Sequence, residues 1–203
     1  MKKVLVYGFI FLFVFPVFNY AQTNLTDFRV TAGMLQNVRG DGEWYDGYRW
    51  TFYPEVQIGG QLLKDPFLWS LYYGFWDDGV SEPITGYDNL ITYSFSSQIV
   101  GIRVGMQTEE ILENDLIQMR FQAGFSHHVL DAAYIGGTDS DDQPGSDFSR
   151  TFEAMEADIG VAVKIYKPVR FYLGFQAMIQ LNNLTSGFRE VRNGGKAGIL
   201  LDF

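Results

Sequence analysis

The two histidines of the chain stand directly after a serine, in the order Ser126-His127-His128. Serine and histidine act as nucleophile and base in many hydrolases when their side chains lie within hydrogen-bond reach. The surrounding residues alternate apolar and polar, as in a β-strand, so Ser126 and His127 point to opposite faces. We therefore expect no nucleophile–base pair between these two residues, and we assign no catalytic residue.

Aspartates crowd one polar segment, TDSDDQPGSD, which contains Asp139, Asp141, Asp142 and Asp147. Carboxylate oxygens bind Ca²⁺, but the calcium-binding loop of twelve residues needs a glycine at position six and a glutamate at position twelve. The segment does not have that spacing. We predict a solvated loop, with no metal site and no cofactor.

A larger set of charged side chains occupies the polar rows of alternating segments: Arg29, Arg49, Glu55, Arg103, Arg120, Glu156, Asp158, Lys164 and Arg170. Charges gathered on one side of a sheet can line an ion path. They can also pair with one another and close the space between them. The elements that carry these residues decide between the two possibilities.

Eight segments with a period of two are predicted to be β-strands. In the clearest, residues 48–62, Trp50 and Phe52 lie on the apolar row and Thr51 and Glu55 on the polar row. Glycine inside a strand costs stability and indicates that another group needs the space its missing side chain leaves. Each segment has one glycine on its polar row: Gly33, Gly59, Gly74, Gly101, Gly124, Gly160, Gly174 and Gly198.

One predicted strand changes parity along its length. Tyr93 and Phe95 are apolar on odd positions, whereas Val100 and Ile102 are apolar on even positions. An extra residue in a strand reverses its parity, so we predict a β-bulge near Ser96–Ser97. On this interpretation the inward position of Gly101 depends on the bulge.

The connectors between the strands alternate in character. The first, third, fifth and seventh are long and polar: RGDGEWYDG, DDGVSEPITGYDN, DAAYIGGTDSDDQPGSDFSR and NLTSGFREVRNGG. The second and sixth, LLKDP and YKP, are tight turns, and the fourth, near QTEEILEND, is intermediate. Long loops on one rim and short turns on the other are typical of outer-membrane barrels. We predict an all-β fold, an eight-stranded antiparallel up-and-down transmembrane β-barrel.

The choice of the outer face separates a membrane barrel from a soluble lipocalin-like ligand binder, which has its apolar row inside. The polar row here is rich in Gly, Gln and Ser rather than in Lys, Glu and Thr. Aromatic residues gather near the strand ends, as in the two interfacial girdles of a membrane barrel. Both observations favour an apolar row that faces lipid.

An eight-stranded barrel is only just wide enough for its own side chains. Charges that point inward must then pair, because an unpaired buried charge costs several kcal/mol. We predict a salt-bridged, plugged lumen in which the glycines leave room for the long arginines. A narrow channel is the alternative.

The N-terminus predicts a secretory signal peptide over residues 1–21, with Lys2 and Lys3 before an apolar run and Ala21 before the cut. The barrel domain then spans 22–203. Removing the two lysines and no acids changes the formal charge from −9 to −11, which argues against nucleic acid as a partner. The chain has no cysteine, which excludes a disulfide framework.

These features together make the chain resemble the small bacterial outer-membrane barrels, the OmpA-type transmembrane domain and its OmpX-like relatives. The most specific element is the ending KAGILLDF, in which Ile199, Leu201 and Phe203 look like the C-terminal signal that the barrel-assembly machinery reads in that family. The resemblance implies the outer membrane of a Gram-negative bacterium, with outer-membrane lipids and lipopolysaccharide as partners.

The resemblance also raises an enzymatic alternative, because some eight-stranded barrels are lipid A deacylases. Those enzymes carry a His-x-Ser-Asn pattern, whereas this chain reads Ser126-His127-His128-Val129. We therefore expect a structural or surface-interaction protein that acts through acidic extracellular loops. The alternatives are a lipid A-modifying barrel enzyme, a narrow channel and, third, a soluble lipocalin-like binder.

Overall fold

The computed structural model describes residues 25–40, 49–61, 67–80, 92–108, 116–136, 146–181 and 189–202. The elements within these ranges are strands: β1 (Leu25–Gly40), β2 (Arg49–Gln61), β3 (Phe67–Val80), β4 (Thr92–Gln107), β5 (Ile117–Gly136), β6 (Phe148–Tyr166), β7 (Val169–Gln180) and β8 (Arg189–Asp202). The predicted signal peptide, Phe203 and the aspartates at 139, 141 and 142 lie outside the described residues.

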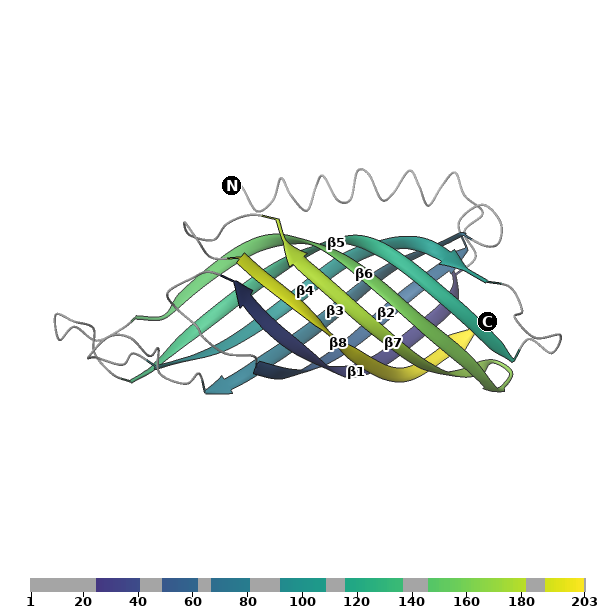
Figure 1. The fold of residues 1–203 in the computed structure, drawn as a ribbon, viewed down its shortest axis with the longest axis horizontal. Coiled ribbons are helices and arrows are strands. Elements are labelled where there is room, and N and C mark those ends of the chain that lie inside the picture. The colour runs from purple at the N-terminus through teal and green to yellow at the C-terminus, as the bar shows by residue number, and fades with distance from the viewer. Residues whose placement is uncertain are drawn as a thin grey trace.

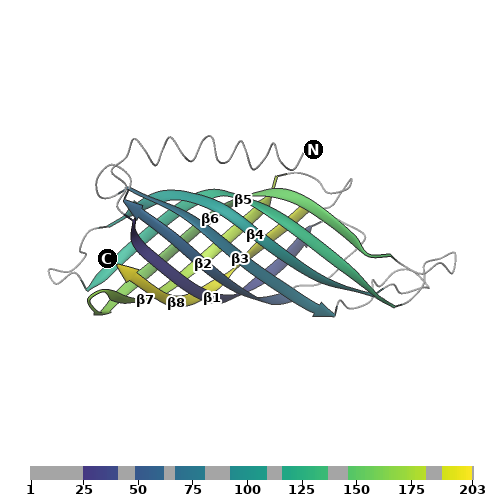
Figure 2. The same cartoon turned by 180° about the vertical axis from the view of Figure 1, so that it is seen from behind.

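The strands form one closed antiparallel barrel in chain order (Figures 1 and 2). Each strand pairs with the next, and β1 closes the barrel against β8, from Asp27 opposite Asp202 to Gly40 opposite Arg189. This up-and-down topology confirms the predicted fold. The end of β8 and the tight β6–β7 turn lie at the same rim, which we call the short-turn rim (Figure 1).

The strands extend further into the connectors than the sequence indicated. β5 continues to Gly136 and β6 begins at Phe148, with Ala132 paired to Phe148. A transmembrane strand needs only about 9–11 residues, and these two strands have 20 and 19. The β5–β6 ladder therefore continues beyond the length that a membrane crossing needs, into the segment predicted as a loop.

The outer face of the barrel carries apolar side chains, and the inner face carries charged and polar ones. Large apolar side chains such as Val30, Phe52, Val104 and Phe125 are exposed on the outside. Arginines and glutamates are buried within, Arg29 and Arg103 completely. This distribution is the reverse of a soluble barrel, and it matches the predicted orientation towards lipid. The described residues contain no helix that is long and apolar enough to span a membrane.

The predicted bulge at Ser96–Ser97 is wrong. β4 pairs with β5 without a shift from Tyr93 opposite Tyr134 to the end of the strand, and the irregularity lies in β3, between Asp77 and Gly79. Phe95 packs against a cluster of apolar side chains inside the barrel, so its row needs no reversal of parity. Gly101 therefore shares the inward row of Arg103 without a bulge.

The eight glycines singled out in the sequence lie in the inward rows, but the space they leave is used differently from our expectation. A Cβ added at four of them would strike a tyrosine ring: Tyr53 at Gly74, Tyr72 at Gly101, and Tyr172 at both Gly160 and Gly174. A Cβ at the other four, Gly33, Gly59, Gly124 and Gly198, would strike backbone of the adjacent strand. The glycines thus admit aromatic rings and close strand approach, and the arginines lie against the rings.

Candidate functional site: the barrel interior

Six charged side chains meet across the middle of the lumen. They carry three positive and three negative charges, each with a fully buried side chain, and they come from five strands: Arg29 of β1, Glu55 of β2, Arg103 of β4, Glu156 and Asp158 of β6, and Lys196 of β8. We call this set the central cluster. Its formal charges cancel, which is the condition under which buried ions are tolerated.

Arg103 pairs with all three carboxylates of the central cluster. Its Nη2 lies 2.7 Å from Glu55 Oε2 and 3.0 Å from Glu156 Oε2, and its Nη1 lies 3.2 Å from Asp158 Oδ2. The planar guanidinium can donate in several directions at once, which a lysine cannot do in the same geometry. One side chain therefore joins the carboxylates of two strands.

Arg29 and Lys196 complete the pairing. Asp158 Oδ2 lies 2.5 Å from Arg29 Nη2 and 2.6 Å from Lys196 Nζ. Glu55 Oε1 accepts from the same two side chains, at 3.3 Å from Arg29 and 2.9 Å from Lys196. Arg29 also donates to the amide oxygen of Gln57. The carboxylates of Asp158 and Glu55 thus each contact more than one cation.

Tyrosines enclose the central cluster. The Arg103 guanidinium lies 3.7 Å from the centroid of the Tyr72 ring, and that of Arg29 lies 4.2 Å from the Tyr172 ring. Tyr172 Oη donates to Asp158 Oδ1 at 2.5 Å, and Tyr53 Oη donates to Glu55 Oε2 at 3.0 Å. Cation–π contact and hydrogen bonding compensate the loss of water around the charges.

A second, apolar layer lies in the lumen on the long-loop side of the central cluster. Its buried members are Leu35, Tyr53, Tyr72, Trp76, Ile99, Leu130, Phe152, Ala154 and Met178. The Arg192 guanidinium lies 3.5 Å from the Trp76 ring. The inside of the barrel is therefore not uniformly polar, which the sequence analysis did not predict.

The other predicted lumen charges lie apart from the central cluster. Arg120 Nη1 pairs with Asp27 Oδ2 at 2.5 Å, and Arg170 Nε pairs with Asp202 Oδ2 at 3.2 Å. Lys164 is half-buried at the short-turn rim. The side chain of Arg49 lies outside the described residues.

Sequence reasoning missed Lys196 and Asp27. Lys196 shares the parity of Gly198, and Asp27 shares that of Arg29, so the period of two was the signal that could have found both. Of the predicted assembly signal, Ile199 is exposed on the outer face and Leu201 is half-buried, while Phe203 is not described.

In the serine–histidine segment, Ser126 forms a hydrogen bond with His128 and not with the adjacent His127. Ser126 Oγ lies 2.9 Å from His128 Nε2, because residues two apart in a strand share a face. Both side chains are buried, and the His128 ring stacks on Phe152 at 4.4 Å between centroids. His127 points outward and pairs with Glu153 at 2.7 Å. Within the described part of the chain, His128 Nδ1 has no hydrogen-bond partner, so no carboxylate there completes a triad.

The solved structures most informative for this fold are bacterial surface and outer-membrane proteins. Neisserial surface protein A is 12% identical to this chain and superposes with a TM-score of 0.66. The match covers 90% of this chain and 100% of the Neisserial protein. A major outer membrane protein from Thermus thermophilus is 11% identical, covers 89% and 100%, and has a TM-score of 0.59. Ail of Yersinia pestis, in complex with the heparin analogue sucrose octasulfate, is 12% identical, covers 88% and 100%, and has a TM-score of 0.50.

No protein-family model and no curated protein matches this chain. The closed barrel, its apolar outer face and its charged interior define an outer-membrane β-barrel protein. More narrowly, its fold is that of the small eight-stranded barrels of the OmpA and OmpX type, as the resemblance in the sequence implied. Among the described residues there is no group of three or more side chains suited to a metal ion.

Proposed function

We propose that the protein is a non-catalytic outer-membrane barrel whose lumen is plugged by its own side chains, and that it acts as a structural or surface-interaction protein through its long acidic loops. The observation that carries the proposal is the central cluster, in which three cations and three anions with fully buried side chains bridge five strands. Function then resides at the ends of the barrel and not in a pore.

The central cluster opposes ion flow for an electrostatic reason. A passing ion would have to displace Arg103 or Lys196 from carboxylates that they contact at 2.6–3.2 Å. Breaking a buried ion pair by removing one partner costs about 3–5 kcal/mol. The apolar layer adds a second barrier, since large buried apolar side chains such as Trp76 and Phe152 fill the lumen there and hydrophobic constrictions resist wetting.

Planar-bilayer recording tests the plugged lumen directly. The purified, folded protein should give no steady conductance across a range of voltages. An Arg29→Ala/Lys196→Ala double variant should show openings more often than wild type, because two of three central cations are gone. A large steady conductance of the wild-type protein would contradict the plug.

The surface role rests on the charge of the loops at the long-loop rim. The connectors 41–48, 81–91 and 137–147 contain nine acidic residues, three, two and four respectively, and no lysine or arginine. Such loops favour cationic partners, or divalent cations that bridge them to the phosphates of lipopolysaccharide. The sucrose octasulfate bound by Ail is a polyanion, and it is a poor electrostatic match for these loops.

Binding to whole cells that display the protein tests the surface role. Cells should retain a cationic probe such as fluorescent polylysine more than cells without the protein, and less as salt rises. Replacing the aspartates at 139, 141 and 142 by asparagine should lower retention of the probe. The control Asn183→Gln, in the uncharged connector 182–188, should leave retention unchanged. Equal retention by all of these cells would refute the acidic-loop proposal.

A further inference from the structure

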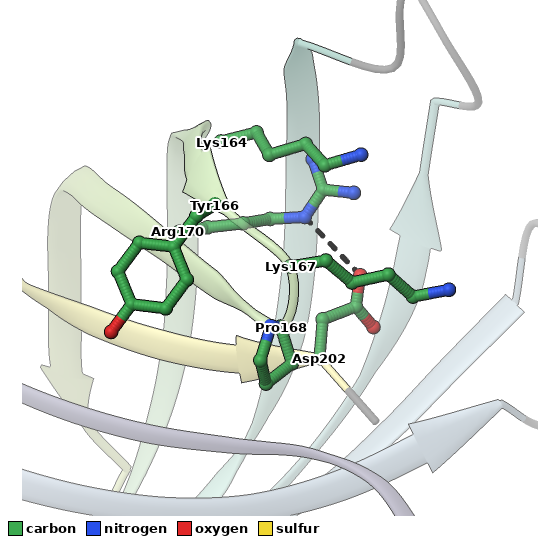
Figure 3. Close-up of a pocket in the computed structure, with 6 residues that line it drawn as sticks. All are labelled: Lys164, Tyr166, Lys167, Pro168, Arg170 and Asp202. Atoms are coloured by element: carbon green, nitrogen blue, oxygen red, sulfur yellow. Dashed lines mark hydrogen bonds and ion pairs between the residues drawn. The ribbon is translucent and has the colours of Figure 1, made fainter.

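A small pocket opens at the short-turn rim, where β6 turns into β7. It is lined by Lys164, Tyr166, Lys167, Pro168, Arg170 and Asp202 (Figure 3). The residues come from the end of β6, the two-residue turn, the start of β7 and the end of β8. The pocket lies at the rim opposite the long loops and takes no part in the central cluster.

The lining of the pocket is strongly cationic. Lys164, Lys167 and Arg170 bring three positive charges, and Asp202 brings one negative charge. The Arg170 Nε–Asp202 Oδ2 contact of 3.2 Å fixes the guanidinium, with the Arg170 side chain nearly buried (Figure 3). Lys164 and Lys167 extend on the same side of the turn as this pair (Figure 3). A site with this excess of cationic donors favours an anion.

Two exposed side chains, Ile165 and Tyr166, lie beside the pocket at a strand irregularity. The register of β6 against β7 shifts between Lys164 and Tyr166, and Ile165 and Tyr166 are 58% and 63% exposed. Tyrosine is enriched at the level of the lipid headgroups, where its ring contacts apolar chains and its hydroxyl contacts polar groups. Cationic side chains and exposed apolar side chains are therefore neighbours at the short-turn rim, on the two sides of the turn (Figure 3).

From this combination we propose that the pocket binds the phosphate group of a glycerophospholipid in the periplasmic leaflet. The unesterified phosphate oxygens would accept hydrogen bonds from Lys164 and Lys167 and from the Arg170 guanidinium. Ile165 and Tyr166 would contact the glycerol backbone and the first methylenes of the acyl chains. Free phosphate lacks these apolar parts, so the adjoining apolar surface selects the lipid. The proposal rests on the membrane location of the barrel.

Native mass spectrometry of the folded protein in a nonionic detergent tests the site. The probe is dihexanoyl phosphatidylglycerol, titrated against wild type, Lys164→Gln, Lys167→Gln and the double variant. A surface lysine contributes about 1 kcal/mol to the attraction of anionic lipid, or about fivefold in affinity. Each single variant should lose about fivefold, and the double variant about 25-fold, on the same estimate. Lys64→Gln, in the connector 62–66 at the same rim, is the matched control and should bind like wild type.

A parallel titration with inorganic phosphate separates the two sources of the anion. Phosphate should compete for the lipid only at much higher concentration than the lipid itself. Equal affinity for lipid and inorganic phosphate would overturn the lipid assignment. Equal losses in Lys64→Gln and in the pocket variants would overturn the pocket. All variants are first checked for heat-modifiable migration on gels, so that a failure of the barrel itself is seen independently of lipid binding.

Discussion

The Tyr72 ring fills the space beside Gly101 and at the same time supports the Arg103 guanidinium, 3.7 Å from the ring centroid. A Cβ at Gly101 would overlap the Tyr72 ring. The glycine, the tyrosine and the arginine are thus one packing unit. The absence of a side chain on β4 sets the position of a ring on β3, and the ring in turn holds a cation of the central cluster.

Gly101→Ala should therefore destabilise the barrel, because the buried ring must shift and take Arg103 with it. Overpacking of this kind typically costs about 1–3 kcal/mol. Urea unfolding in detergent, followed by tryptophan fluorescence, measures the change. Gly136→Ala is the matched control, since a Cβ there meets nothing within 4 Å. Equal stability of the two variants would show that the Tyr72 ring is not tightly held.

Arg103→Met should destabilise the barrel more than the glycine variant does. The substitution keeps most of the side-chain volume and leaves Glu55 and Glu156 without a cation that lies 2.7 Å and 3.0 Å from them. Breaking a buried pair in this way costs about 3–5 kcal/mol. Adding Glu55→Gln should recover part of the loss, as measured in a double-mutant cycle. Additive effects of the two substitutions would argue against direct coupling.

His128→Ala should lower stability and leave lipid A unchanged. The variant loses the Ser126 hydrogen bond and the stacked contact with Phe152, and a large-to-small change of this size in a packed interior costs about 2 kcal/mol or more. Mass spectrometry of lipid A from expressing cells, with and without the substitution, should give the same acyl pattern. Loss of acyl chains in wild type alone would revive the enzymatic alternative.

Deletion of Phe203 should reduce the yield of folded barrel in the outer membrane severalfold. The terminal aromatic residue with Ile199 and Leu201 resembles the signal of the barrel-assembly machinery, and a missing signal slows insertion. The heat-modifiable fraction of the protein in isolated outer membranes measures the effect. Asp202→Asn leaves the aromatic residue in place and should assemble with near wild-type yield. Normal yield after the deletion would refute the assembly signal.

The strands and their faces could be predicted because side chains in a strand alternate with a period of two and each face has its own environment. The same rule assigned Arg29, Glu55 and Asp158 to the interior. It did not predict the apolar layer, since Trp76 and Phe152 lie inward where polar residues were expected. The contacts of Lys196 with Glu55 and Asp158 depend on which strands face each other across the lumen, and alternation within one strand carries no such information.

The prediction of a bulge in β4 was wrong because the apolar layer was not foreseen. We expected apolar residues on one face only, so Phe95 required a bulge. Phe95 instead packs against the apolar layer, and the irregularity lies opposite it in β3. The inward row of β4 is apolar near the long loops and charged further along. In the sequence this change looks the same as a strand whose apolar residues switch from one face to the other.

Asp158 contacts both strands at the seam of the barrel. β1 and β8 are the first and last strands, and their pairing is the seam that turns an open sheet into a barrel. Arg29 of β1 and Lys196 of β8 both contact Asp158 Oδ2, a single oxygen of β6. That oxygen can hold both cations only when the two ends of the sheet have met. The simultaneous contact of both cations with that oxygen therefore stabilises the closed barrel relative to an open sheet.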